Sequence, residues 1–258
     1  MKNSFFRGRV TRSLLLAFAV GIFTFLSPAE AGEQIDYTLW NQVLQNYVND
    51  QGLVDYEGLK GHPQALNAFV QQVQNADLDS LTDSEEKAFW INAYNAITLS
   101  VVVDKYPVKG IRWINFGLVW EIGRPVAGTK KSLGEIEHDI LRPLGDPRIH
   151  FAINCASIGC PLLSDMPFYP ETLDEQLEEA AGKFINNPEK VRLDKTSNTL
   201  YYSAIFDWFE DDFLVVENSL LDYIKKYINP EDKAYLDKHD VSMKVLDYDW
   251  GLNKQQKK

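Results

Sequence analysis

The chain has 258 residues, of which 45% are hydrophobic and 24% charged, and it contains 15 Gly, 11 Pro and two Cys. These counts exclude collagen-like, low-complexity and disulfide-dense proteins, because each class needs a bias in Gly, Pro, charge or Cys that this chain lacks. The formal net charge of −11 argues against a nucleic-acid partner and against an anionic lipid surface, since both depend on clustered Lys and Arg.

Residues 1–31 have the pattern of a secretory signal peptide. Four basic residues precede an apolar run at 14–26, and Ala29-Glu30-Ala31 forms an A-x-A cleavage site. The apolar run is shorter than the roughly 20 residues that a membrane-spanning helix needs. We therefore expect cleavage after Ala31, a periplasmic or secreted protein without stable membrane insertion, and one globular domain over residues 32–258.

Helical patterns dominate the start of that domain. Apolar spacing from Leu39 to Val48 predicts a first helix, capped by Asp36. The spacing from Leu66 to Val73 predicts a second helix that begins near Pro63. Both helices read as ordinary contributors to a core.

A longer central helix is predicted over residues 84–103. Thr82 and Glu85 form a capping box at its start. From residue 88 onward the helix is apolar nearly all the way round, so it is expected to be nearly fully buried. Asn92 and Asn95 interrupt this pattern on one face, and these amides either tie neighbouring loops together or point into a site.

A strand-like pattern at residues 113–120 precedes a short helix that ends near Arg142 and is opened by a second capping box, Ser132 to Glu135. A carboxylate, Glu137, falls within the buried stripe expected at 100° per residue, and His138 lies at its edge. A buried carboxylate must be paired or carry a raised pKa, and both are common in functional sites. The apolar members of the stripe are Leu133, Ile136, Ile140 and Leu144.

The two cysteines lie where a predicted strand at 148–153 breaks into small residues. Alternation places His150 and Asn154 on one face of that strand. Cys155 and Cys160 allow a disulfide, which suits an exported protein, or a nucleophilic thiol assisted by a histidine. The third interpretation is a metal site, although the C-x-x-C spacing typical of zinc is absent. Its ligands would be His150, Cys155, Cys160 and a further histidine, His138.

The rest of the chain is expected to be mainly scaffold. A third capping box, Thr172 to Glu175, opens a helix that ends near Asn186. The acidic residues 210–212 lack the ordered oxygen ligands of a calcium loop, which favours a solvated acidic edge. The remaining predicted elements are strands at 191–194 and 199–206, a helix at 219–228 and a closing strand at 241–250.

Five sequence blocks resemble a known family. FWINAYNAITL, SLGEIEHDILRP, HFAINCASIGCPLL, SAIFDWFEDDF and YDWGLN are similar, in this order, to domain of unknown function 547, over about residues 85–253. This chain has Gly159 where the family more often carries Ser, which weakens any role for a hydroxyl there. No activity comes with the family name. The resemblance implies matching positions at Trp90, Asn92, Tyr94, Asn95, Glu137, His138, Arg142, His150, Asn154, Cys155, Cys160, Pro161, Phe206, Trp208, Asp212, Phe213, Asp249, Trp250 and Asn253.

These patterns predict an α+β fold, with helices packed on a modest, mostly antiparallel sheet. One expected function is cysteine-dependent acyl transfer on a peptide-like, thioester-like or other small substrate. Cys155 would be the nucleophile, His138 or His150 its base, and Glu137 the residue that orients the base. The substrate carbonyl would be polarised by Asn92 or Asn95.

The alternative function is a non-catalytic exported binding or assembly module. In that case Cys155 and Cys160 form a disulfide, and the polar residues hold a pocket together without chemistry. No cofactor is expected in either case. Further candidates for the pocket are Arg142, Asn154, Cys160, Trp90 and Tyr94.

Overall fold

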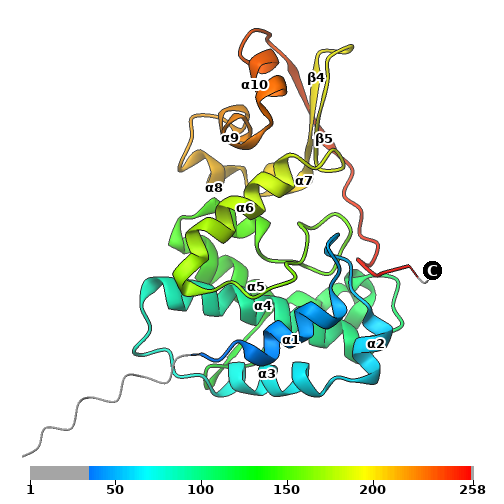
Figure 1. The fold of residues 1–258 in the computed structure, drawn as a ribbon, viewed down its shortest axis with the longest axis vertical. Helices are drawn as coiled ribbons and strands as arrows, with labels where there is room; N and C mark the ends of the chain where they lie inside the picture. The colour runs from blue at the N-terminus through cyan, green and yellow to red at the C-terminus, as the bar shows by residue number, and fades with distance from the viewer. Residues whose placement is uncertain (1–34, 257–258) are drawn as a thin grey trace, which may run out of the picture. The chain divides into compact units, whose positions relative to one another are not determined.

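The computed structural model describes residues 35–256, so the predicted signal peptide and its cleavage site lie outside the described residues. The first four helices lie together in the lower half of Figure 1, and α3 contacts both α1 and α4. Their bounds are Thr38–Tyr47 for α1, Tyr56–Gly61 for α2, Gln64–Asn75 for α3 and Asp83–Lys105 for α4.

Local hydrogen bonds explain where these helices begin. Asp36 accepts from the Thr38 amide at 2.8 Å, one residue before the cap position of α1. The capping box of α4 is confirmed: the Thr82 hydroxyl accepts from the Glu85 amide at 3.3 Å, and the Glu85 carboxylate accepts from the Thr82 amide at 2.8 Å. Two of the free amides at the start of α4 are satisfied in this way.

Burial along α4 is concentrated in its middle. Every residue from Ala88 to Leu99 is buried, whereas the first turn and the last two residues are not. Charged residues occupy both ends of the helix, from Asp83 to Lys87 and at Asp104 and Lys105. The apolar middle therefore lies in the core while the charged ends remain in contact with solvent.

The predicted strand at 113–120 is wrong. The segment η1 (Ile111–Trp120) forms 3₁₀ turns, interrupted at Asn115, Phe116 and Gly117, whose φ angles of 50°, 57° and 88° are left-handed. An extended strand cannot contain three successive residues in that region. A short antiparallel hairpin follows, made of β1 (Arg124–Val126) and β2 (Thr129–Lys131).

The second capping box is confirmed, with Ser132 and Glu135 exchanging hydrogen bonds of 2.7 and 3.1 Å. The helix that follows is irregular. It consists of α5 (Leu133–Glu135), the π-helical η2 (Ile136–Leu141) and the 3₁₀ turn η3 (Arg142–Leu144).

This irregularity makes the expected buried stripe wrong after Ile136. Leu141 is buried in place of Ile140, and Leu144 is exposed. Glu137 is half-buried. A π-helical turn contains an extra residue, so the later side chains rotate away from their α-helical positions.

The predicted strand at 148–153 is also wrong, because the 3₁₀ turns of η4 (Pro147–Phe151) take its place. Pro147 starts them, and the preceding Asp146 accepts from the Arg148 amide at 3.1 Å. Without a strand there is no alternation, and every residue from Ile149 to Asn154 is buried.

Thr172 stands directly before α6 (Leu173–Ile185), but the third capping box does not form. The Thr172 hydroxyl instead donates to Gln176 at 3.2 Å. The short turn η5 (Pro170–Thr172) leads into this helix.

A three-stranded sheet of order β3-β4-β5 lies in the other half of the fold. β3 and β4 pair antiparallel, whereas β4 and β5 pair in parallel, with Leu200 opposite Met243. The parallel pair needs a long connection, which four short helices supply. In chain order these elements are β3 (Val191–Asp194), β4 (Thr199–Ser203), α7 (Ala204–Trp208), α8 (Glu210–Leu214), α9 (Leu220–Tyr227), α10 (Pro230–Leu236) and β5 (Ser242–Leu246).

Two hydrophobic cores result. The first is built mainly from α1–α4, and the second from β3, β4 and α7–α10 together with Phe151. α6 contributes Leu177 to the first core and Phe184 to the second, and Figure 1 shows it between the two groups. The fold is α+β, as predicted. In the part of the chain that the structure describes, no helix has the length and apolar character to cross a bilayer.

Candidate functional site

Most of the predicted site residues meet in one cavity of about 220 Å³, which we call the disulfide pocket. It lies between the two cores, because Ile153 of the first core and Ile205 of the second both line it. Six of the predicted candidates line this pocket: Tyr94, Glu137, His138, His150, Cys155 and Cys160.

Cys155 and Cys160 are joined by a disulfide, and the chain has no other cysteine. The Tyr248 hydroxyl lies 3.2 Å from Cys155 Sγ and 3.1 Å from Cys160 Sγ. Within residues 35–256, no hydrogen bond joins either sulfur to a histidine. Neither sulfur can act as a nucleophile while the disulfide is closed.

The C-terminal residues 248–251 hold the disulfide loop, residues 155–160, in place. The Ile158 and Gly159 amides donate to the carbonyls of Gly251 and Asp249, each at 2.8 Å. A Cβ at position 159 would lie 2.7 Å from the Tyr248 ring, so neither Ala nor Ser fits there without displacing that ring. Gly159 therefore allows Tyr248 to reach the two sulfurs.

Lys190 fixes the same loop from the second core. Its side chain is buried, and its ammonium group donates to the Ile158 carbonyl. Burial lowers the pKa of Lys190 to about 8, against the opposing influence of Asp249 and Glu189. The contact is structural, since Lys190 does not line the pocket.

A charged array adjoins the pocket at His150. His150 Nε2 lies 2.7 Å from Asp212 Oδ2. Arg142 donates to both oxygens of the same carboxylate, at 2.7 and 2.9 Å. His150 is buried and stacks on Phe209, with the ring centroids 4.0 Å apart. Asp212 therefore fixes the orientation of the imidazole and of the guanidinium at once.

The predicted solvated acidic edge at residues 210–212 is wrong for Asp212. Its side chain is only 20% exposed, whereas Glu210 and Asp211 are exposed as expected. Burial alone would raise the pKa of Asp212, but hydrogen bonds from His150 and Arg142 outweigh burial and hold that pKa well below its usual range. Charge clustering gave no sign of this role, and only the resemblance of the block SAIFDWFEDDF singled out the position.

Glu137 and His138 line the pocket from η2. The Tyr94 hydroxyl donates to Glu137 Oε2 at 3.3 Å. His138 is exposed, and its Nδ1 lies 3.3 Å from Arg142 Nη1. The structure thus assigns the orientation of a histidine to Asp212 rather than to Glu137.

Asn92 does not line the pocket. Its oxygen accepts from Trp40 Nε1 at 3.1 Å and from the Phe168 amide at 3.0 Å. Its nitrogen donates to the carbonyls of Ala88 and Phe168 at 2.9 and 2.8 Å. All four hydrogen-bonding positions of this amide are used, so Asn92 ties α4 to the chain before α6 and does not polarise a substrate.

Asn95 and Asn154 form a second structural tie. Asn95 donates to the Ala152 carbonyl at 3.0 Å and accepts from the Asn154 amide at 2.8 Å. The Asn154 side chain donates to the Pro161 carbonyl and accepts from the Ala156 amide, each at 2.7 Å. These two side-chain amides hold the backbone around the disulfide loop and do not line the pocket.

The alternative metal site does not form. His150 is bonded to Asp212, and the two sulfurs are bonded to each other. Among residues 35–256, no group of three or more His, Cys, Asp or Glu side chains is arranged to hold a metal ion.

Two further predicted pocket candidates do not line the disulfide pocket. Trp90 donates to Glu86 at 3.1 Å, and Arg142 donates to Asp212 at 2.7 Å.

Aromatic side chains complete the pocket wall, and the sequence patterns did not single them out as binding residues. Trp208 and Trp250 stack with ring centroids 5.8 Å apart, and Tyr248 lies 4.5 Å from Trp250. Only the resemblance pointed to Trp208 and Trp250, because an isolated aromatic in a sequence is more often a core residue. Besides Tyr94, five aromatic residues line the wall: Trp120, Trp208, Phe209, Tyr248 and Trp250.

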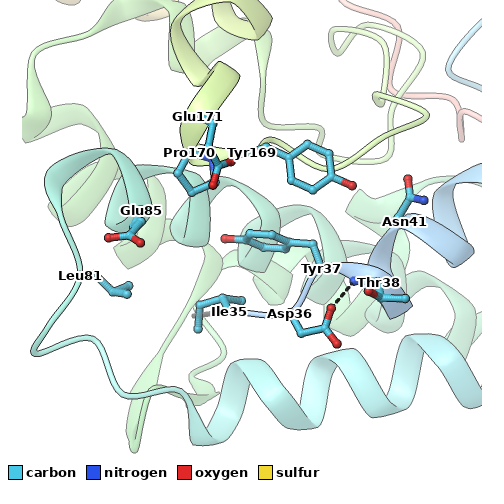
Figure 2. A pocket seen from close by; sticks show the side chains of 10 residues that line it. All are labelled: Ile35, Asp36, Tyr37, Thr38, Asn41, Leu81, Glu85, Tyr169, Pro170 and Glu171. Atoms are coloured by element: carbon cyan, nitrogen blue, oxygen red, sulfur yellow. Dashed lines mark hydrogen bonds between the residues drawn. The ribbon is translucent and has the colours of Figure 1, made fainter. Parts of the chain in front are cut away.

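A second cavity, of about 440 Å³, lies beside the start of α1 (Figure 2). Tyr37 and Tyr169 meet edge to face in its wall, with ring centroids 5.9 Å apart. Two of its carboxylates already serve as acceptors for backbone amides: Asp36 for Thr38, drawn as a dashed line in Figure 2, and Glu85 for Thr82. Its lining contains no Cys or His, so it is a weaker candidate than the disulfide pocket.

Residues 78–185 match the model of the family described as "Protein of unknown function, DUF547". The matched region belongs to this family. It includes α4, η2 and the two cysteines. Asp212 and four aromatic residues of the pocket wall lie beyond it: Trp208, Phe209, Tyr248 and Trp250. The match therefore ends before residue 253, the expected end of the resemblance. Comparisons with curated proteins and with solved structures found no match.

Proposed function

We propose that the disulfide pocket binds a peptide-like ligand through its free amino group, without covalent chemistry while the disulfide is closed. The observation that carries this proposal is Glu137, a carboxylate lining a cavity whose other walls are mainly aromatic. Aromatic faces attract organic cations, and a carboxylate adds a charged hydrogen-bond acceptor. A peptide amine next to an apolar side chain matches both features.

The proposal is tested with a matched pair of probes, a short phenylalanine-containing peptide with a free N-terminus and the same peptide N-acetylated. Isothermal calorimetry is expected to show about fivefold to tenfold tighter binding of the free amine, the range of a partly solvated ion pair. Glu137→Gln is expected to remove that difference. The exposed neighbour Asp139 provides the control, because Asp139→Asn leaves the pocket lining intact. Equal binding of both peptides, or none, would contradict the proposal.

Cysteine-dependent acyl transfer is a second candidate, favoured by one observation: His150, whose Nε2 contacts Asp212, lines the same pocket as Cys155 and Cys160. Two equivalents of an external thiol must first reduce the disulfide, giving two protein thiols and one external disulfide. Cys155 is half-buried and Cys160 buried, so Cys155 is the expected nucleophile and the faster site of iodoacetamide labelling.

Free-thiol titration before and after reduction, followed by hydrolysis of an N-acetyl-phenylalanine thioester, tests this candidate. We expect no thiols before reduction and, after it, hydrolysis that Cys155→Ser abolishes. Reduced protein without hydrolysis would rule out acyl transfer on this class of substrate. Faster labelling of Cys160 would reverse the two cysteine assignments.

We further propose that the protein is exported after cleavage behind Ala31. The support is the basic and apolar pattern of residues 1–31 and the A-x-A site, together with a disulfide that an oxidising compartment would maintain. Intact mass of protein from its host is expected to match a chain that starts at Gly32. A mass that includes residues 1–31 would contradict cleavage.

A further inference from the structure

One short turn exposes two large aromatic side chains and a leucine. In η1, the side chains of Trp113, Phe116 and Leu118 are 71%, 102% and 57% exposed. We call these three residues the apolar turn. Exposed Trp and Phe side chains on one short turn are unusual for a surface that contacts only water.

The backbone of the apolar turn is anchored and does not trail in solvent. Ile111, Ile114 and Val119 on the same segment are buried in the first core. Left-handed residues between them, including Phe116 itself, reverse the chain and keep the Phe116 ring outside the core. The turn is therefore a fixed apolar projection.

The segment that contains the turn is basic, although the whole chain is acidic. Residues 105–131 contain six of the chain's 26 basic residues but only one of its 37 acidic residues, Glu121. Arg112 lies in η1, and Arg124 donates to the Val119 and Ile122 carbonyls at 3.4 and 2.7 Å. Lys131 lies opposite Arg124 in the β1–β2 hairpin, and Lys130 lies beside Gly123.

The salt bridges of the described residues do not include these basic side chains. Among residues 35–256, none of the six basic residues at 105–131 takes part in a salt bridge. Elsewhere, Arg142, Arg148 and Lys195 are all paired with carboxylates. An acidic chain thus carries a basic segment, residues 105–131, that contains the apolar turn.

We infer that the apolar turn and its basic surroundings bind the surface of an anionic lipid bilayer. Trp and Phe side chains favour the boundary between headgroups and acyl chains, and Lys and Arg are attracted to anionic headgroups. Such peripheral binding needs no spanning helix. It is separate from ligand binding in the disulfide pocket, although Arg112 joins the two regions: its guanidinium lies 4.6 Å from the ring centroid of Trp250 in the pocket wall.

Co-sedimentation with lipid vesicles tests this inference. Protein is expected to sediment with vesicles of phosphatidylcholine mixed with phosphatidylglycerol, and several-fold less with phosphatidylcholine alone or at high salt. The double variant Trp113→Ser, Phe116→Ser is expected to reduce binding to anionic vesicles by about fivefold or more, because it removes the apolar contact. All variants share one N-terminus, so the differences report the turn.

Two matched controls use residues exposed elsewhere. Val215, 73% exposed, gives Val215→Ser for the apolar change. Lys233 and Lys238 give a double Lys→Glu control for Lys130→Glu, Lys131→Glu, which is expected to weaken binding about as much as added salt. Thermal melts confirm that each variant is folded. Equal sedimentation of wild type and turn variants, or equal loss in the controls, would overturn the inference. A concentration-dependent dimer that the turn variants abolish would assign the turn to a second copy of the chain instead.

Discussion

Two polar clusters lie within this fold, the amides around α4 and the charged groups at the disulfide pocket, and they differ in how completely their hydrogen bonds are used. Asn92 is surrounded by four protein partners at 2.8–3.1 Å, and Asn95 and Asn154 bond to neighbouring backbone groups. Glu137, in contrast, has one hydrogen bond within residues 35–256 and lines a cavity. A buried polar group is therefore evidence for a ligand site only where its partners leave part of it unused.

The largest effect on stability is expected from the α4 cluster. Asn92→Ala removes four hydrogen bonds and leaves the Trp40 indole and both backbone groups of Phe168 without their partner. We expect a loss of about 3 kcal/mol in the free energy of unfolding, measured by urea titration. Asn75, an exposed amide on α3, is the control, and Asn75→Ala is expected to cost under about 0.5 kcal/mol. Similar small losses in both variants would remove the contrast between the clusters.

The expected loss of stability at Asp212 is intermediate, because its carboxylate bonds to charged groups but is partly solvated. Asp212→Asn is expected to cost about 2 kcal/mol at neutral pH, since Arg142 loses an ion pair and His150 a charged acceptor. The folded-state pKa of Asp212 lies below its unfolded value, so this contribution is complete above about pH 5, where the unfolded carboxyl is also ionised. It is lost as the pH falls through the folded-state pKa.

Urea titrations of wild type and Asp212→Asn from neutral pH downward measure that dependence. The stability difference between the two proteins is expected to be constant above about pH 5 and to shrink below about pH 4. A difference that stays constant to the lowest measurable pH would show that the carboxylate charge does not stabilise the fold.

The elements that follow local rules could be predicted, and those fixed by tertiary contacts could not. Two of three capping boxes formed because Thr82 and Ser132 needed only their own helix as partner. The third did not form: Thr172 ends the 3₁₀ turn η5 with ψ of 12°, whereas Thr82 and Ser132 have the extended backbone of a cap residue. At η2 the π-helical turn overrode the 100° periodicity, and at η1 and η4 runs of β-branched and aromatic residues resembled strands although both segments fold into 3₁₀ turns.

The candidate site shows the same division. His150 and Cys155, which are close together in the sequence, line the same pocket. Asp212 follows His150 by 62 positions, and no periodicity relates two residues so far apart. The choice among a disulfide, a nucleophilic thiol and a metal site at the two cysteines could not be made from the sequence either. Sequence spacing does not show whether the two sulfurs approach each other.

Removing the disulfide tests how much the cross-link of the loop contributes to stability. The double variant Cys155→Ser, Cys160→Ser is expected to lose about 2 kcal/mol, the contribution of a cross-link that closes a short loop. Reduction of the wild type is expected to give the same loss, and reductant is expected not to affect the double variant. A loss well above this in the double variant but not on reduction would mean that serine disrupts the contacts with Tyr248.

Glu137 is expected to show the smallest effect on stability, and it distinguishes the two clusters most directly. It is half-buried and accepts one hydrogen bond from Tyr94, so Glu137→Gln, which keeps an acceptor, should change the free energy of unfolding by less than about 0.5 kcal/mol. Glu137→Ala is expected to cost about 1 kcal/mol, because the Tyr94 hydroxyl loses its acceptor. Thermal melts of both variants, set beside their peptide affinities, separate stability from binding. Loss of affinity with retained stability supports a binding carboxylate, whereas a large loss of stability would place Glu137 with the α4 amides as part of the structural framework.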